Sequence, residues 1–291
     1  MNTHTTTTTR LRNGRSITIE QFGPASAAPV LLLPSAPGSR LIDPDPSATE
    51  RLGVRLLVAD RPGYGGSDRY PADVVPNWEL FAALLAEALQ TVGTGRLSLV
   101  GWSNGGVAAL ALAATHPELV SSLAIVATPA PDDAVPWVGQ EYRRVLQQLR
   151  ATPESAVASL EAMFAATQGA PDDEALLAMV CSGPDDRALL QGVALRSRLL
   201  AMLREAFAQG AAGLAADIVA THVAAWSPQL ESVVAPVHLY YGATDELVRP
   251  AHGEYYRDRL RQAQLRVLPH QGHLTLAASW EQILQSSLAV G

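Results

Sequence analysis

Short apolar runs recur along the chain and are separated by longer segments with helical periodicity. The runs cover residues 30–33, 55–59, 97–100, 123–126, 237–241 and 265–268. Runs of this length are typical of parallel strands that are buried on both faces. An Asn13-Gly14 pair between segments 10–12 and 15–22 predicts a hairpin, which adds antiparallel strands at one edge. The pattern therefore predicts a mostly parallel sheet of about eight strands.

Helical patterns lie between these runs. Residues 78–91 have apolar side chains at helical spacing, Asn77 is a favourable N-cap, and Gly93 follows the end. Three further segments, 104–115, 250–261 and 275–288, have the same character. Alternating strands and helices predict an α/β fold with helices on both faces of the sheet.

The alternation stops after the sixth expected strand. Residues 131–222 contain only helical patterns, which predict helices at 136–150, 153–168, 172–181, 185–207 and 211–220. We therefore expect a disordered tail at 1–9, a core formed by 10–130 and 223–291, and a helical cap at 131–222. The simplest place for such a cap is over the carboxyl edge of the sheet.

The composition narrows the function classes. Hydrophobic residues make up 48% of the 291 positions and charged residues 17%, which favours a large buried core. The net charge of -7 and the lack of a basic run do not favour nucleic-acid binding. The single cysteine, Cys181, excludes an internal disulfide and is expected to be a small buried residue. Without a secretory pattern or a run of about 18 apolar residues, we expect a cytoplasmic protein without a membrane span.

One motif carries a specific chemical signal. The sequence Gly101-Trp102-Ser103-Asn104-Gly105 lies between the expected strand at 97–100 and the small-residue helix at 104–115. Gly-x-Ser-x-Gly in this context predicts a tight turn that exposes a nucleophilic serine hydroxyl, with glycines leaving room for the chain to pass itself. Ser103 is therefore the candidate nucleophile.

A second motif follows the strand that ends at Ala59. The run Asp60-Arg61-Pro62-Gly63-Tyr64-Gly65-Gly66-Ser67 is similar to the D-x-x-G-x-G-x-S turn of esterases, haloperoxidase-like enzymes and proline iminopeptidases. With the serine motif, it makes the chain resemble the α/β-hydrolase superfamily over nearly its whole length. The turn's expected role is structural, and Asp60 is not expected to be catalytic.

The candidate base is His273. It lies in Gln271-Gly272-His273-Leu274, between the last strand and the last helix, and resembles the Gly-His of the superfamily. His270 is the nearest rival. His238 lies within an expected strand, where a core role is the simpler interpretation.

The candidate acid is Asp245, which follows the strand at 237–241. Gly242-Ala243-Thr244-Asp245 matches the superfamily's G-x-x-D, and the chain order Ser, Asp, His is the one expected for this fold. Asp132 and Asp133, after the strand at 123–126, stay open as the alternative.

The resemblance also implies an oxyanion hole formed by backbone N–H groups. Asn104, directly after the nucleophile, supplies one, and Ala36 aligns with the usual second donor. Here Pro34-Ser35 replaces the His-Gly of most relatives, and neither Pro34 nor Pro37 has an N–H to donate. Ser35 either adds a hydroxyl donor or holds the loop.

Three tryptophans are candidates for the site or for its packing. Trp102 and Trp137 are candidate substrate contacts together with Ser35, and packing is the alternative for each. Trp226 resembles a packing tryptophan of many relatives.

These residues predict hydrolysis of a carboxylic ester, or a related acyl bond of a small molecule, through an acyl-enzyme on Ser103. A serine in the motif disfavours dehalogenase and epoxide hydrolase chemistry, which needs a carboxylate nucleophile. No metal or cofactor motif is present, so none is expected. Carbon–carbon, thioester or peptide hydrolysis, perhydrolysis, a non-hydrolytic binding protein or cyclase, and a homodimer all stay open.

Overall fold

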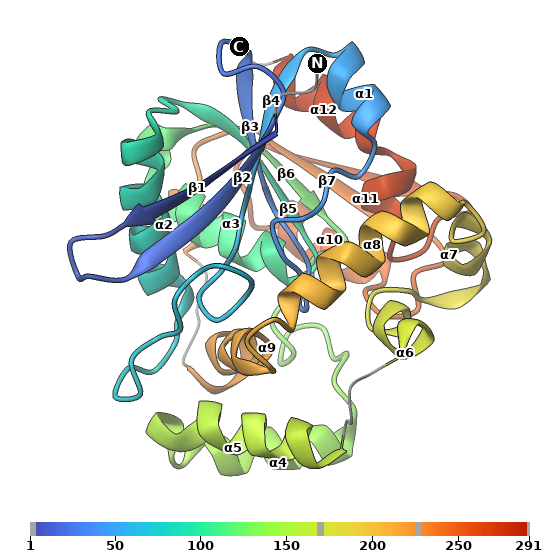
Figure 1. The fold of residues 1–291 in the computed structure, drawn as a ribbon. Helices are drawn as coiled ribbons and strands as arrows, with labels where there is room; N and C mark the ends of the chain where they lie inside the picture. The colour runs from blue at the N-terminus through green and yellow to red at the C-terminus, as the bar shows by residue number, and fades with distance from the viewer. Residues whose placement is uncertain (1–3, 168–171, 225–228, 290–291) are drawn as a thin grey trace.

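The computed structural model describes residues 4–167, 172–224 and 229–289, so Trp226 lies outside the described residues. One eight-stranded sheet runs through the molecule in the order β1-β2-β4-β3-β5-β6-β7-β8 (Figure 1). Only the β1–β2 and β2–β4 pairs are antiparallel, which confirms a mostly parallel sheet. The strands are β1 (His4–Arg10), β2 (Ser16–Phe22), β3 (Ala28–Leu33), β4 (Val54–Ala59), β5 (Leu97–Trp102), β6 (Val120–Val126), β7 (Val237–Gly242) and β8 (Ala263–Leu268).

The N-terminal segment is ordered from His4 onward, so the expected disordered tail is wrong for residues 4–9. Strand β1 pairs with β2 over its whole length, from His4↔Phe22 to Arg10↔Ser16. Its threonines are β-branched and favour extended backbone. Thr8 and Thr18 also join their hydroxyl groups across the pair at 3.0 Å. The threonine-rich segment at 4–9 thus forms part of an edge strand because it pairs with β2.

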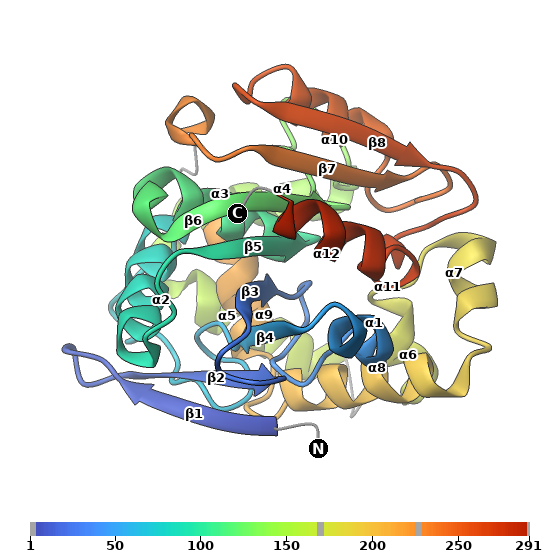
Figure 2. The same ribbon diagram turned by 90° about the horizontal axis from the view of Figure 1, so that it is seen from above.

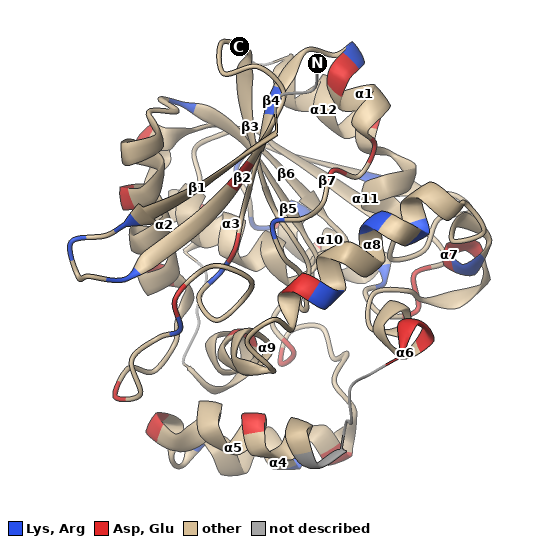
Figure 3. Ribbon diagram, viewed as in Figure 1, with Lys and Arg blue, Asp and Glu red and all other residues tan. Residues whose placement is uncertain are grey.

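Helices cover one face of the sheet in the way the sequence predicts. Helices α2 (Trp78–Val92), α3 (Asn104–Thr115) and α10 (Pro250–Arg257) bury their apolar residues against it. Helix α2 begins where the Asn77 side chain accepts a hydrogen bond from Leu80 N at 2.8 Å, and it ends at Gly93, whose φ is 70°. The central strands β3, β5 and β6 carry no charged residue (Figure 3). Charged and catalytic side chains are therefore expected beyond the ends of these strands, and not within them.

The opposite face is covered by helices from three parts of the chain. These are α1 (Pro46–Arg51), the C-terminal α11 (Thr275–Ala278) and α12 (Trp280–Leu288), and α8 (Val193–Ala206) from the insert (Figure 2). Leu199, Met202 and Leu203 of α8 are at most 1% exposed. Part of the insert therefore belongs to the main hydrophobic core.

A helical insert follows β6, as predicted. It contains α4 (Gln140–Arg150), α5 (Pro153–Thr167), α6 (Asp173–Ala178), α7 (Gly183–Leu189), α8 and α9 (Ala212–Ile218), then a π-helical turn η2 (Val219–Val223). The single helix expected at 185–207 is wrong, because α7 and α8 are separate. Gly192, the N-cap of α8, has extended backbone, and glycine weakens a helix that would otherwise continue. Short 3-10 turns occur at Pro117–Leu119 (η1) and Leu230–Ser232 (η3).

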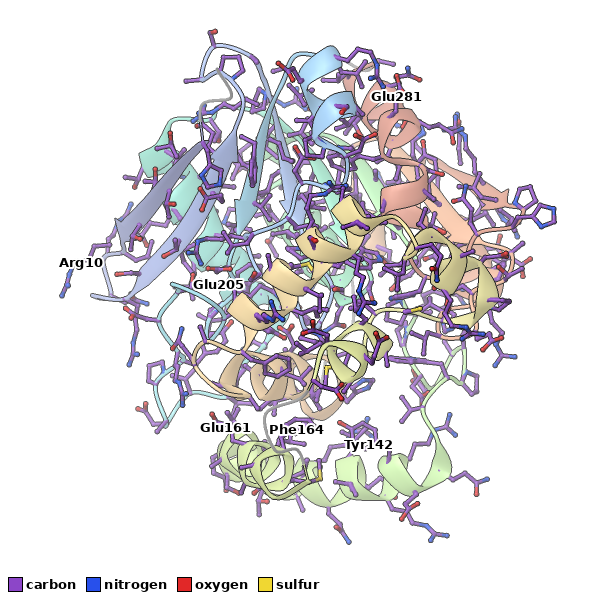
Figure 4. The ribbon with its side chains drawn as sticks, turned by 45° about the vertical axis from the view of Figure 1, so that its right-hand side comes forward. Arg10, Tyr142, Glu161, Phe164, Glu205 and Glu281 are labelled. Atoms are coloured by element: carbon purple, nitrogen blue, oxygen red, sulfur yellow. The ribbon has the colours of Figure 1, made fainter. Side chains whose placement is uncertain are left out.

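The insert packs in two places rather than as one cap. Helices α4, α5, α9 and η2 form a small cluster of their own, whereas α6 and α8 join the core on the sheet. Tyr142 and Phe164 project from α4 and α5 toward the rest of the molecule (Figure 4). A single cap over residues 131–222 therefore does not describe the insert, because its first and last helices form one cluster and its middle helices pack on the sheet. Among the described residues, no helix combines the length and apolarity needed to cross a bilayer.

Candidate active site

Ser103 sits on a strained turn between β5 and α3. Its φ of 54° and ψ of -126° lie in a region that costs a non-glycine residue roughly 1–3 kcal/mol. The flanking glycines allow this turn because the chain passes very close to itself. A Cβ on Gly101 would lie 2.4 Å from Gly106 Cα, and one on Gly105 would lie 2.1 Å from Leu33 O. The Gly-x-Ser-x-Gly spacing therefore follows from steric need.

The three residues predicted as nucleophile, base and acid meet at the carboxyl edge of the sheet. His273 Nε2 lies 3.0 Å from Ser103 Oγ, and His273 Nδ1 lies 2.9 Å from Asp245 Oδ2. His273 and Asp245 are each 3% exposed, whereas Ser103 is half-buried. This gives one hydrogen-bonded series from a buried carboxylate to a hydroxyl group that solvent can reach.

The other oxygen of Asp245 is also fully used. Its Oδ1 accepts hydrogen bonds from Leu247 N at 2.8 Å, Val248 N at 2.9 Å and Ser182 Oγ at 3.0 Å. Burial alone raises the pKa of Asp245, but attraction to His273 and these backbone hydrogen bonds outweigh it and lower the pKa. The group is thereby held as an oriented carboxylate.

The rival residues have other surroundings. His270 is exposed and has a φ of 56°. Asp132 accepts hydrogen bonds from Trp137 N and Val138 N and pairs with Arg143 at 2.6 Å, while Asp133 is exposed. The His273 ring is hydrogen-bonded to Asp245, so the geometry favours His273 as base and Asp245 as acid over His270, Asp132 and Asp133.

The loop after β3 lies beside the serine turn. A Cβ on Gly105 would also meet Pro34 O at 2.3 Å, so loop and turn are in close contact. Within the part of the chain that the structure describes, the N–H groups of Ala36 and Asn104 have no acceptor. Ser35 Oγ donates to Pro37 O at 2.8 Å, so this hydroxyl holds the loop.

The two candidate tryptophans lie in different environments. Trp102 is 1% exposed and its indole Nε1 donates to His273 O at 2.9 Å, so it supports the histidine loop from within the core. The Trp137 ring lies 5.4 Å from that of His222 and 6.4 Å from that of His252. Its buried Nε1 has no hydrogen-bond partner among the described residues. Their direct contact with a substrate stays a prediction.

A cavity of about 670 Å³ opens next to this region. It is bounded by the segment after β6, by α4 and by η2, and many of its lining side chains are polar or charged: Asp132, Asp133, Arg143, Gln147, Arg150 and His222. Thr221 also lines it and places its hydroxyl 3.1 Å from Asn104 Oδ1, which ties the cavity to the serine turn. Burial lowers the pKa of His222 and of His252 to about 4, so both rings are neutral near pH 7.

Sequence reasoning missed several residues that organise the site. Arg61 donates to Pro34 O and Ser35 O, each at 2.7 Å, and so fixes the loop after β3. Arg61 stands in the glycine-rich turn after β4, but the pattern of that turn does not indicate which groups its side chain contacts. Ser182 and Asp186 come from the insert, where no local motif marks them. Among the described residues, no three His, Cys, Asp or Glu side chains lie close enough together to hold a metal ion.

Comparison with known proteins agrees with the fold and with the predicted resemblance. Residues 28–277, well over half of the chain, match the family described as alpha/beta hydrolase fold. The chain therefore belongs to the α/β-hydrolase fold family.

Individual relatives include more than one kind of hydrolase. The chain is 32% identical over 238 residues to a pimeloyl-(acyl-carrier protein) methyl ester esterase of Chromobacterium violaceum, covering 77% of this chain and 79% of that protein. It is 36% identical over 140 residues to a 2-hydroxy-6-oxononadienedioate/2-hydroxy-6-oxononatrienedioate hydrolase of Burkholderia vietnamiensis, covering 45% of this chain and 46% of that relative's length. A solved hydrolase from Pseudomonas aeruginosa has a TM-score of 0.73 and 23% identity over 97% of this chain and 98% of its own, a likeness in fold alone.

Proposed function

We propose that this protein is a serine hydrolase that cleaves a carboxylic ester, or a closely related acyl bond, of a small molecule. The observation that carries the proposal is the hydrogen-bonded series Ser103–His273–Asp245 on a strained turn, with spacings of 3.0 and 2.9 Å. A weak nucleophile needs an adjacent base, and the base needs an oriented acid, so this arrangement suits acyl transfer.

In the proposed mechanism, His273 Nε2 accepts the hydroxyl proton as Ser103 Oγ attacks the carbonyl carbon. Asp245 fixes the ring tautomer and stabilises the imidazolium. The N–H groups of Asn104 and Ala36 donate to the oxyanion of the tetrahedral intermediate. The leaving alcohol takes the proton from His273, which leaves an acyl group on Ser103. A water molecule then repeats the attack, and its proton passes through His273 back to Ser103.

Ester cleavage is the first choice because the relative matched over 77% of this chain is named as a methyl ester esterase. The polar lining of the adjacent cavity favours a substrate with polar groups over a long alkyl chain.

Carbon–carbon bond hydrolysis is the second candidate. Its support is the 36% identity, over a shorter 140-residue match, to a hydrolase named for an oxo-dienedioate. The same serine, histidine and oxyanion donors serve either reaction, so only substrates distinguish them.

A fluorophosphonate probe tests the central proposal. Labelling of the wild-type protein that is lost in Ser103→Ala is the expected result. A folded wild-type protein whose serine does not react would overturn it. A panel of p-nitrophenyl esters of increasing chain length, assayed beside a 2-hydroxy-6-oxo-dienedioate, then separates the two candidates: turnover of the esters alone favours ester hydrolysis, and faster loss of the dienedioate favours the second.

A further inference from the structure

A short segment of the insert contacts two loops at once. The acid loop, residues 243–249 between β7 and α10, holds Asp245, and the base loop, residues 269–274 between β8 and α11, holds His273. The segment runs from Ser182 to Asp186, at the start of α7. Asp245 and His273 lie 28 positions apart in the chain and belong to different loops. Ser182 and Asp186 are 5% and 1% exposed, so the segment is buried against both of them.

Ser182 acts on the acid loop. Its hydroxyl donates to Asp245 Oδ1 at 3.0 Å and accepts a hydrogen bond from Glu246 N at 3.1 Å. The neighbouring Asp185 accepts a hydrogen bond from the Thr244 hydroxyl at 2.6 Å. The insert therefore contacts the acid itself and the residues on either side of it.

Asp186 acts on the base loop. Its Oδ2 accepts hydrogen bonds from His273 N at 2.8 Å and Ser182 N at 2.6 Å, and its Oδ1 accepts one from Leu274 N at 2.9 Å. Three backbone donors on one side chain match the acceptor pattern of a carboxylate. A Cβ at Gly272 would lie 2.5 Å from Asp186 Oδ1, so the glycine before the histidine is needed for this close approach.

We propose that Ser182 and Asp186 are positioning residues that fix the acid loop and the base loop relative to each other. The insert thereby takes part in setting the distance and orientation between Asp245 and His273. This inference rests on the proposed function. Neither residue touches Ser103 or a substrate; each acts through Asp245 or His273. Such support matters because small misplacements of reacting groups cost large factors in rate.

The charges around the histidine allow this role to be separated from a purely structural one. Two carboxylates bond to residue 273: Asp245, from the loop after β7, at the ring, and Asp186, from α7, at the backbone. Trp102 packs beside the ring and is neutral. Removing the Ser182 hydroxyl takes a hydrogen-bond donor away from Asp245, so its carboxylate is less stabilised on its own and attracts the imidazolium more strongly. Burial raises the pKa of Asp186, but its backbone donors and attraction to His273 favour the charged form. Replacing that carboxylate with a neutral amide removes a negative charge near the histidine and disfavours the imidazolium.

The test compares Ser182→Ala and Asp186→Asn with wild type in steady-state ester hydrolysis. Both variants should lower kcat, Asp186→Asn by about tenfold or more, while KM changes little. The acid limb of the kcat/KM profile should move to higher pH in Ser182→Ala and to lower pH in Asp186→Asn. Ser182→Thr, which keeps the hydroxyl, should return the limb toward its wild-type position.

Matched controls come from buried groups that bond elsewhere. Asp43→Asn changes a 5% exposed carboxyl that accepts from Thr49 Oγ1 at 2.8 Å, and Ser98→Ala removes a hydroxyl that donates to Ser287 O at 2.8 Å. Both controls should keep the wild-type kcat and acid limb, even where they lower the melting temperature. Folded Ser182 and Asp186 variants that behave like these controls would overturn the positioning role, while Ser103 labelling still supports the hydrolase. Wild-type protein without Ser103 labelling would instead remove the proposed function itself.

Discussion

At the residue scale, His273 is held at four points. The ring bonds Asp245 and Ser103, the backbone N–H donates to Asp186, and the backbone carbonyl accepts from the Trp102 indole. These contacts come from the acid loop, the nucleophile turn, the insert and the strand β5. If His273 is the base, as proposed, a ring fixed from so many sides needs little reorganisation before it accepts a proton, which lowers the entropic cost of reaction.

Replacing this histidine should remove most of the activity. We expect His273→Ala to lower kcat by about 10³-fold or more, because Ser103 then lacks its base. His270→Ala, three positions away on the exposed part of the loop, should stay within about twofold of wild type. Steady-state kinetics on one ester measures both variants. A larger loss for His270→Ala than for His273→Ala would show that the base is assigned to the wrong residue.

Residues whose role is encoded by a local pattern could be predicted from the sequence. Ser103 stands in a motif whose glycines are required by contacts of 2.1 and 2.4 Å, and His273 follows a glycine next to the last strand. Ser182 and Asp186 could not be predicted, because their role arises from where the insert folds back. Nothing in the spacing of a helical segment reveals which loop it will reach.

At the element scale, a buried ion pair joins helix α9 to the turn after β4. Arg61 and Asp217 are 1% and 4% exposed, and they pair at 2.8 Å. Tyr64 also donates to Asp217 at 2.9 Å, and a Cβ on Gly213 of α9 would lie 2.5 Å from the Tyr64 ring. Arg61 in turn holds the carbonyl groups of the loop after β3. The insert is therefore connected to the proposed oxyanion loop as well as to the acid and base loops.

Breaking this pair should be costly. In Asp217→Ala the buried Arg61 guanidinium loses its counter-charge, and we expect the free energy of unfolding to fall by about 3–5 kcal/mol. Urea denaturation measures the change. Asp173→Ala is the control, since its ion pair with Arg204 is exposed and should contribute no more than about 1 kcal/mol. Equal losses in the two variants would mean that Arg61 finds another partner.

Elements were easier to predict than their partners. The alternation of apolar runs and helices indicates the sheet, and Asn13-Gly14 indicates the opening hairpin. The extent of β1 is not predicted, because its threonine-rich sequence at 4–9 lacks an apolar face and depends on pairing with β2. The apolar periodicity continues across Gly192, so the sequence pattern does not indicate the break between α7 and α8. The packing of α8 on the sheet depends on contacts between residues far apart in the chain, so no local pattern indicates it.

At the scale of the whole molecule, buried titratable groups make stability depend on pH. The pKa of His222 and of His252 falls from 6.5 to about 4 on burial. Both rings stay neutral in the folded protein, whereas the unfolded chain takes up protons below 6.5, so stability is lost as the pH falls from 6.5 toward 4. Burial raises the pKa of Asp43 to about 6, so this group binds its proton in the folded state first and adds stability as the pH falls through 6.

Two variants should therefore change the acid dependence in opposite directions. His222→Leu should reduce the stability lost between pH 7 and pH 4.5, by up to about 3 kcal/mol. Asp43→Asn removes the opposing contribution and should make the loss larger. Urea unfolding at both pH values gives the differences. The same pH dependence in wild type and both variants would show that neither group changes its pKa on folding.

The position of α8 limits how a substrate gains access to Ser103. Leu199, Met202 and Leu203 complete the apolar layer on the sheet. An outward movement of the entire insert would expose that layer to water, at a free-energy cost of about 25 cal/mol for each Å² of apolar surface. Helices α4 and α5 bury their apolar residues in the separate cluster with α9 and η2, so moving this outer pair would expose that smaller cluster and leave the layer on the sheet covered. On the proposed function, we therefore expect small molecules to reach Ser103 past α4 and α5, while α7 keeps its contacts with the loops that hold Asp245 and His273.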